Sequence, residues 1–338
     1  MRCLETGLWS DVRGLPAALA DTLDAADGVA DAAALLRSES VGRIVATGNG
    51  AAYYVAHALW LSALESRGAG PPIVAVPCGV AVRDGFRWQS GDALLAVSSS
   101  GEFRDVVALA RAAADAGRPC VAVTATADSS LAATATASVV QRVHAQRAVT
   151  HTQALAGAYA CALATWAAAT GDEALAAVLE GAVDAAARAV SEAESWARSS
   201  LGEVRPPTAA VAAGGGPAWA AALELALMLK EIARVPAEGV ETREGATSAM
   251  FGLDRGHLMV GLDPADDPLG DEALRLCAAT GAQTLRLPGV NGVDPRLAPI
   301  TTLPAAAALA AELALAAGHD VDHPAWVDAY YETARGAT

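Results

Sequence analysis

Three consecutive serines and a glycine, SSSG at residues 98–101, directly follow an apolar run, LLAV at 94–97. Such a run is typical of a parallel strand covered on both faces, and residues 103–116 after it have the composition of a helix. The serines would therefore lie where free backbone N–H groups and the helix dipole favour an anion. The hydroxyls of Ser98, Ser99 and Ser100 predict a phosphate-binding loop. Ordinary turn or N-cap chemistry is the alternative, because Ser and Gly also favour such turns.

A second candidate anion loop is the glycine turn Gly48-Asn49-Gly50, which follows the first predicted strand. Its position places it at the same sheet edge as the serines. Glycines of this kind often only permit a tight turn. The turn lacks the third glycine and the following acidic residue of a dinucleotide fingerprint, so we expect no nicotinamide site and no other cofactor.

Two carboxylates could carry acid–base chemistry on a predicted helix, ALELALMLKE at residues 222–231. Glu224 and Glu231 are seven residues apart and so share one helix face. A carboxylate on a leucine-rich face is costly unless it is used. Aldose–ketose isomerisation needs a base that takes and returns a proton, usually a carboxylate of raised pKa. Glu231 is therefore the candidate base, and a pair of solvated glutamates is the alternative.

The elements that must position these residues are those of an α/β protein. The chain has 338 residues, enough for two domains, and 53% of them are hydrophobic, with alanine-rich helices between Val- and Leu-rich strands. The net charge of −15 argues against nonspecific binding to nucleic acid or to an anionic membrane. No spacing of histidines or cysteines suggests a metal site.

Compartment signals point to a soluble protein of the cytoplasm. The five cysteines contain no CxxC pair and indicate buried structural thiols in a reducing environment. The amino terminus lacks the apolar segment of a signal peptide, and the long alanine-rich runs are too weakly hydrophobic to predict a membrane span.

An internal repeat divides the chain. Residues 45–56, VATGNGAAYYVA, match residues 211–222, VAAGGGPAWAAA, at an offset of 166, and residues 111–125 resemble 275–289. Two copies of one unit are predicted, each a doubly wound, mainly parallel sheet flanked by helices. The expected organisation is an N-terminal helical segment at 1–30, a first domain at 31–170, a helical connector at 171–200 and a second domain at 201–338.

The two copies differ at the proposed anion loop. Where the first has SSSGE, the second has GLDPADDP at residues 261–268. We expect Asp263, Asp266 and Asp267 to repel a phosphate, so that only the first copy binds one.

The glycine turn, the S-x-S-G-E loop, the duplication and the ALE-x-A-L-x-L-K-E helix together resemble the double-SIS group of the sugar isomerase (SIS) family. This group includes the isomerase half of glucosamine-6-phosphate synthase, amino-sugar isomerases and deaminases, and Amadori-product deglycases. The resemblance covers nearly the whole chain, because residues 11–22 are similar to the opening helix motif and HDVDHP at 319–324 to the closing motif. It implies two tandem SIS-type domains, the first of which binds a phosphosugar.

The resemblance also implies roles for individual residues. Glu231 would be the proton shuttle, with His151 as a second catalytic candidate. The positions expected to bind the substrate are Gly48, Asn49, Gly50, Ser98, Ser99, Ser100, Val149, Thr152, Glu224, Glu244 and His323. From the residues alone, Glu241 and Glu244 are solvated loop charges, His151 is a satisfied pocket histidine and His323 caps a turn.

Three family positions differ here. Phe103 stands where a phosphate-binding threonine often follows Gly-Glu, Thr247 where the synthase has a histidine, and about Ala329 where it has a lysine. The implied function is an isomerase, deaminase or deglycase of an amino-sugar or Amadori-type sugar phosphate, which works as a homodimer with a shared active site. A non-catalytic phosphosugar-binding regulator and a scaffold protein that kept only the fold are the other readings.

Overall fold

The computed structural model describes residues 2–66, 70–83, 86–264, 267–289 and 291–335. By contact the chain forms two compact units, each assembled from separate segments. The first unit consists of Ala17–His144, Gln153–Gly181 and Trp326–Thr338, and the second of Met1–Pro16, Ala145–Thr152 and Ala182–Ala325. Helix α1 (Gly7–Ala25) therefore contributes to both.

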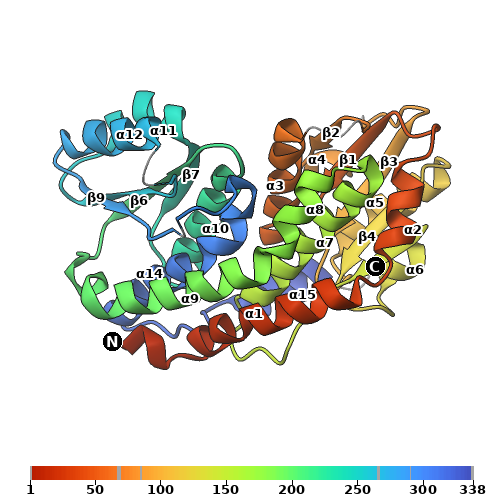
Figure 1. Cartoon of the computed structure of the whole chain (residues 1–338). Helices are drawn as coiled ribbons and strands as arrows, with labels where there is room; N and C mark the ends of the chain where they lie inside the picture. Colours follow the sequence, from red (N-terminus) through yellow and green to blue (C-terminus); the bar gives the residue numbers. More distant parts are fainter. Residues whose placement is uncertain (1, 67–69, 84–85, 265–266, 290, 336–338) are drawn as a thin grey trace. The chain divides into compact units, whose positions relative to one another are not determined.

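The first unit is built on a parallel sheet with the order β2-β1-β3-β4-β5 among the described residues (Figure 1). Every residue of its central strand β3 is buried, which confirms the strand predicted from the apolar run. A strand that is covered on both faces has apolar residues at successive positions, because both of its sides are buried. The strands are β1 (Arg43–Thr47), β2 (Ile73–Ala75), β3 (Asp92–Val97), β4 (Cys120–Thr124) and β5 (Ala137–Val140).

Helices flank this sheet. The helix predicted after the serines is α5, which buries Val106, Leu109, Ala110 and Ala113 at the spacing of one helix face. The helices of the first unit are α2 (Val29–Leu36), α3 (Ala51–Glu65), α4 (Cys78–Ala81), α5 (Arg104–Asp115), α6 (Ser130–Thr134), α7 (Thr152–Thr170), α8 (Glu173–Glu180) and α15 (Val327–Arg335).

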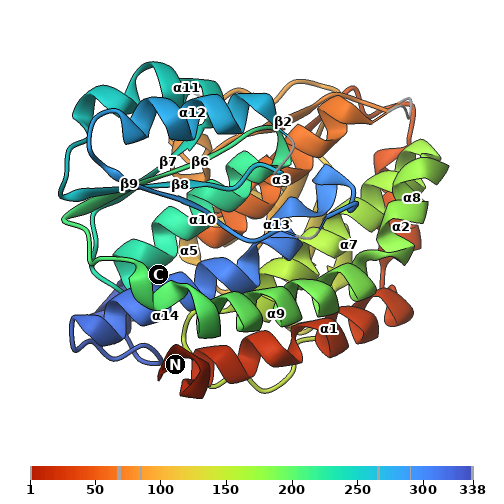
Figure 2. The same cartoon turned by 60° about the vertical axis from the view of Figure 1, so that its left-hand side comes forward.

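The second unit has a parallel sheet with the order β7-β6-β8-β9 in the part of the chain that is described. Helices α11 and α12 lie on one face of this sheet, and α10 and α14 on the other (Figure 2). The strands are β6 (Ala209–Gly214), β7 (Ala237–Glu241), β8 (His257–Gly261) and β9 (Gln283–Arg286). Its helices are η1 (Arg2–Glu5), α9 (Ala182–Ser199), η2 (Leu201–Glu203), α10 (Pro217–Glu231), α11 (Thr242–Thr247), η3 (Ala249–Gly252), α12 (Pro268–Ala278), η4 (Pro295–Leu297), α13 (Ala298–Thr301) and α14 (Leu303–Ala316).

The sequence repeat is also a structural repeat. Helices α3 and α10 both have 15 residues and begin 166 positions apart, at Ala51 and Pro217. The glycine before each helix has nearly the same conformation, with φ 53° and ψ −129° at Gly50 and φ 51° and ψ −136° at Gly216. Such positive φ values favour glycine. The fold is therefore α/β, with two parallel sheets that are each flanked by helices, as the sequence predicted.

One apolar segment, Pro295–Ala316, is long and apolar enough to span a membrane by length and composition alone, with a mean hydropathy of 1.4 over 18 residues. Of that window, 89% is buried inside the structure, which is the behaviour of a core helix. The prediction of buried thiols is confirmed, because all five cysteines are free and buried.

Candidate functional site

The topology of the first sheet brings the two predicted anion loops together. Strands β1 and β3 are parallel neighbours, with Thr47 opposite Ala96, so Gly48–Gly50 and Ser98–Gly101 leave the same edge side by side. From β1 the chain passes to β2 on one side and then to β3 on the other. The carboxyl ends of strands at such a switch point are where open α/β sheets bind ligands.

The serine loop is not the N-cap of helix α5. The N-cap is Phe103, and no side chain caps this helix end. Within the loop, the Ser98 hydroxyl accepts a hydrogen bond from Gly101 N at 3.1 Å, and the Ser100 hydroxyl accepts one from Glu102 N at 3.3 Å. A hydroxyl that accepts in this way still has its own hydrogen to donate. The N-cap alternative is therefore wrong, whereas the two bonds are ordinary turn chemistry, as the other half of that alternative expected. Each outer serine keeps a hydroxyl hydrogen to donate, and Ser98 is 2% exposed.

Neighbouring strand β4 fixes the shape of this loop. The Ser99 carbonyl accepts hydrogen bonds from Ala125 N at 3.0 Å and from the Thr124 hydroxyl at 3.1 Å. Gly101 has φ +67°, and a Cβ there would lie 2.1 Å from the Ser129 hydroxyl oxygen, so only glycine fits. The loop is thus held before any ligand arrives.

The second sheet has a carboxylate at the equivalent place. Ala46 pairs with Leu95 in the first sheet and Ala212 with Val260 in the second, so Ser98 and Asp263 each follow the paired residue by three positions. Asp263 is 4% exposed. One of its oxygens accepts from Gly215 N at 2.6 Å and the other from the Thr242 hydroxyl at 2.6 Å, while burial raises its pKa.

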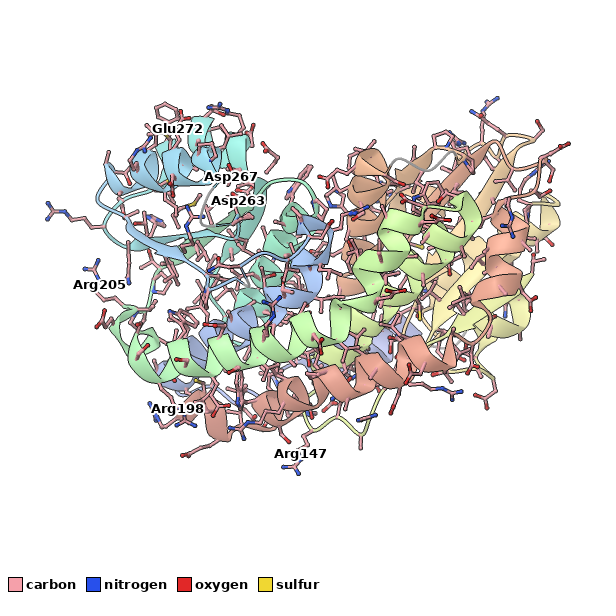
Figure 3. The ribbon with its side chains drawn as sticks, in the orientation of Figure 1. Arg147, Arg198, Arg205, Asp263, Asp267 and Glu272 are labelled. Atoms are coloured by element: carbon pink, nitrogen blue, oxygen red, sulfur yellow. The ribbon has the colours of Figure 1, made fainter. Side chains whose placement is uncertain are left out.

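Two of the three acidic residues of the second copy are engaged within the protein. Asp263 fills the turn itself, and Asp267 caps helix α12 by accepting from Leu269 N at 2.8 Å. Figure 3 labels Asp263 and Asp267 in this unit. Asp266 lies outside the described residues.

The two candidate carboxylates of helix α10 have different environments. Glu224 is 6% exposed, and within the described chain its Oε2 has no hydrogen-bond partner. Burial and the nearby charge of Glu231 raise the Glu224 pKa to about 8. Glu231 is exposed in this single chain, although partial burial of its carboxyl still raises its pKa against the opposing effect of Lys230. The expectation of two solvated glutamates is wrong for Glu224.

The opening and closing motifs of the chain hold the sugar-pocket segment, residues 147–152, which contains the predicted substrate-binding residues Val149 and Thr152. The Asp11 carboxylate accepts hydrogen bonds from Arg147 N and Ala148 N, both at 2.8 Å. The Asp322 carbonyl accepts from Val149 N at 2.9 Å, and the Asp322 carboxylate accepts from the first backbone N–H groups of α1 at 2.8 Å. Sequence reasoning named these motifs but missed the role of the two aspartates, which is to position residues 147–149.

The side chains of this segment are placed as follows. Thr152 is fully buried, and its hydroxyl has no partner among the described residues, whereas His151 is exposed and Val149 is half-buried. His323 is also exposed, and its backbone N–H donates to Asp320 at 3.0 Å. That bond fits the turn that was the alternative for His323.

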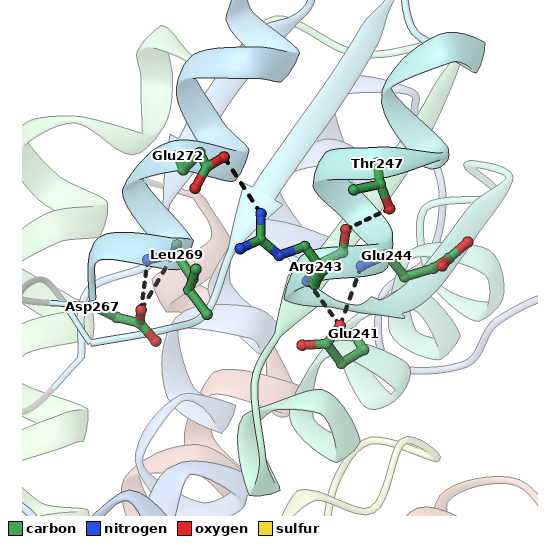
Figure 4. A network of polar contacts seen from close by, with 8 residues as sticks. Glu241, Arg243, Glu244, Thr247, Asp267, Leu269 and Glu272 are labelled. Atoms are coloured by element: carbon green, nitrogen blue, oxygen red, sulfur yellow. Dashed lines mark hydrogen bonds and ion pairs between the residues drawn. The ribbon is translucent and has the colours of Figure 1, made fainter.

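Glu241 and the candidate site residue Glu244 lie at the start of a short helix, α11. The Glu241 carboxylate caps it by accepting from Arg243 N at 2.8 Å and Glu244 N at 3.2 Å. Arg243 reaches Glu272 of α12 at 3.4 Å, and the Glu244 side chain points away from Arg243 (Figure 4). The Glu244 carboxylate accepts from the Ser248 hydroxyl. Glu241 therefore has a structural role, and Glu244 stands on the outer side of the helix.

Residues 36–170 match the SIS domain family. In sequence, the chain is 27% identical over 344 residues to the glutamine–fructose-6-phosphate aminotransferase (isomerizing) of Aeropyrum pernix. That alignment covers 91% of this chain and 54% of the relative, so the chain spans about half the length of the curated relative it matches.

Solved structures show the same fold. The C-terminal domain of glucosamine-fructose-6-phosphate aminotransferase from Francisella tularensis is 19% identical, with a TM-score of 0.79 over 94% of this chain and 98% of that one. The tagatose-6-phosphate ketose/aldose isomerase of Escherichia coli is 18% identical, with a TM-score of 0.72 over 94% and 95%. The glucosamine-6-phosphate deaminase of Thermotoga maritima is 17% identical, with a TM-score of 0.68 over 91% and 97%.

Proposed function

We propose that this chain is an enzyme that isomerises, deaminates or deglycates an amino-sugar or Amadori-type sugar phosphate. The observation that carries the proposal is the pair of loops at Gly48–Gly50 and Ser98–Ser100, which meet at the switch point of the SIS-domain sheet. The similar proteins named above all have a sugar phosphate in their names. A phosphate at the loops would accept hydrogen bonds from the hydroxyls of Ser98 and Ser100 and from the uncapped N–H groups at the start of α5.

Glu231 is our candidate for the proton shuttle. It would take a proton from one carbon of the open-chain sugar and return it to the adjacent carbon or to a nitrogen leaving group. Its raised pKa suits a base that must also give the proton back. His151 is exposed beside the sugar-pocket segment and is our candidate for the second acid.

We propose that the active site is completed in a homodimer. Glu231 is exposed in the single chain, whereas a proton shuttle works in a site closed to water. The segment after α11 carries Phe251, which is 83% exposed, and a large exposed aromatic side chain is typical of an interface.

Sedimentation at micromolar concentration is expected to give a dimer of the 33.9 kDa chain. Phe251→Asp should weaken the dimer, because it places a charge in an apolar contact. Arg275→Glu, a charge change at an exposed residue of α12, serves as the control. A wild-type monomer would contradict the dimer.

The proposed function is tested with a thermal-shift panel of hexose and hexosamine 6-phosphates and their N-substituted derivatives. A ligand at a hundred times its Kd should stabilise the protein by about 2.7 kcal/mol. Ligands that bind are then assayed for isomerisation and for release of ammonia or amine. Absence of binding by every phosphosugar would refute the proposal.

The serine loop should account for most of the affinity. In the double variant Ser98→Ala/Ser100→Ala, each lost donor to the anion costs about 1.5–3 kcal/mol, so Kd should rise at least about a hundredfold. Calorimetry with the best ligand of the panel measures this. Ser38→Ala/Ser40→Ala is the matched control, because these exposed serines bond to each other at 2.9 Å before β1. Unchanged affinity in the loop variant would place the phosphate elsewhere.

A phosphosugar-binding regulator is the second candidate. The exposure of Glu231 favours it, together with Thr247 and Ala329 at the positions of the family's histidine and lysine. A regulator would bind a ligand of the panel and release no product. For either function we propose the cytoplasm, a reducing compartment that suits five free cysteines.

A further inference from the structure

We propose that the second unit contains an oxyanion-binding cradle that is occupied by the chain's own Asp263 carboxylate. Removal of that carboxylate should open the cradle to a free oxyanion such as inorganic phosphate. The inference goes beyond the proposed function, since it requires neither a sugar nor catalysis.

The first support is that the second unit keeps the geometry of the first turn. A Cβ at Gly48 would lie 2.5 Å from the backbone of Ala52, and a Cβ at Gly214 would lie 2.3 Å from the backbone of Ala218, so both turns press against the helix that follows. The conformations of Gly50 and Gly216 agree within a few degrees, as described above. The glycine turn of the second unit is thus a copy of the turn in the first, whereas the Thr242 hydroxyl belongs to the second unit alone, since Val76 stands 166 positions before it in the first.

The second support is that an anion is already bound there. Gly215 N, in the glycine turn before α10, and the Thr242 hydroxyl, on the first residue of α11, each donate to Asp263 at 2.6 Å. The hydroxyl distance is typical of a charge-assisted hydrogen bond, and the N–H bond is at least as short. One backbone N–H and one hydroxyl thus hold the carboxylate, and the same two donors could hold one oxygen each of a free oxyanion.

The third support is a neighbouring cation and the room made by glycine. Arg286 donates to the Asp263 carbonyl at 2.8 Å and also pairs with Asp271. Burial raises the Asp263 pKa, and the positive charge of Arg286 only partly opposes this. A Cβ at Gly270 would lie 2.9 Å from the Asp263 Cβ, so a side chain at position 270 would displace the carboxylate.

The consequence is that one group fastens three elements. Asp263 follows β8 and binds Gly215, in the turn before α10, and Thr242, the first residue of α11. Helix α10 carries Glu224 and Glu231, and α11 carries Glu244. In the second unit, Asp263 therefore takes the place that a phosphate would take in the first unit under the proposed function. A phosphate is then expected to bind only at the loop of the first unit.

The test is rescue by a small anion. Asp263→Ala, made in the Ser98→Ala/Ser100→Ala background so that the first loop cannot respond, should unfold at a lower temperature. Inorganic phosphate should raise that temperature, in comparison with chloride at equal ionic strength, and should not raise it in the parent with Asp263 intact. Asp263→Asn should not respond, because its amide oxygen can still accept from Gly215 N.

Asp267→Ala is the matched control, because it removes the α12 cap and leaves the cradle filled. It should lose stability without gaining a phosphate response. If Asp263→Ala does not fold, Asp263→Ser, which copies Ser98, is refolded with and without phosphate. A response of the Asp263 variants no larger than that of Asp267→Ala, or refolding that does not depend on phosphate, would overturn the inference.

Discussion

Glu231→Gln is expected to abolish turnover while sugar-phosphate affinity changes little. The amide keeps the size and polarity of the carboxylate but cannot accept a proton, and loss of a positioned base costs about 10²–10⁴-fold in rate. Affinity should persist because the proposed phosphate site consists of the loops after β1 and β3, which this change does not touch. Steady-state kinetics for kcat and calorimetry for Kd separate the two effects.

Glu238→Gln is the control for this experiment. Glu238 is an exposed glutamate on β7 of the same unit, and its replacement should leave kcat unchanged. Near-normal turnover in Glu231→Gln would transfer the role of base to Glu224, Glu244 or His151. A wild type that binds a phosphosugar and converts none would favour the regulator.

Glu224→Gln is expected to change how stability depends on pH. The Glu224 pKa is about 8 in the folded protein and near 4.3 when unfolded, so between these values only the folded state holds the proton. Stability therefore falls as pH rises through this window, by about 1.4 kcal/mol for each pH unit. The amide does not titrate, so the variant should be more stable than the wild type at pH 8 and similar to it near pH 4.5.

Chemical denaturation at several pH values measures this difference. His57, whose pKa burial lowers to about 4, also contributes to the pH dependence, but equally in both proteins. Glu238→Gln should follow the wild-type curve. A parallel pair of curves for wild type and Glu224→Gln would show that Glu224 is ionised in the folded protein.

Local sequence patterns predicted much of the fold and the placement of the two candidate anion loops at one sheet edge. Continuous apolar runs identified buried strands such as β3, because both faces of a parallel strand are covered. The repeat of 166 residues predicted two copies of one unit, and the structure adds that Gly50 and Gly216 have nearly the same conformation. The position of Ser98 followed from the same rules.

Features that depend on distant contacts could not be predicted. The sequence showed Asp263 as a negative charge, but not that it turns inward to Gly215 and Thr242. Likewise, Asp11 and Asp322 meet residues 147–149 across separations of more than a hundred positions. Glu231 was expected on a buried helix face, yet the end of α10 is exposed, because amphipathic spacing describes a helix and not what covers its last turn.

Hydrogen–deuterium exchange with and without a bound sugar phosphate tests the central claim most directly. We expect backbone amides of residues 48–50 and 98–104 to exchange more slowly in the complex, because the phosphate accepts from the loops and from the start of α5. Amides of residues 214–216 should be unchanged, because Asp263 already occupies that turn. Protection of 214–216, or no protection at 98–104 under saturating ligand, would contradict the account.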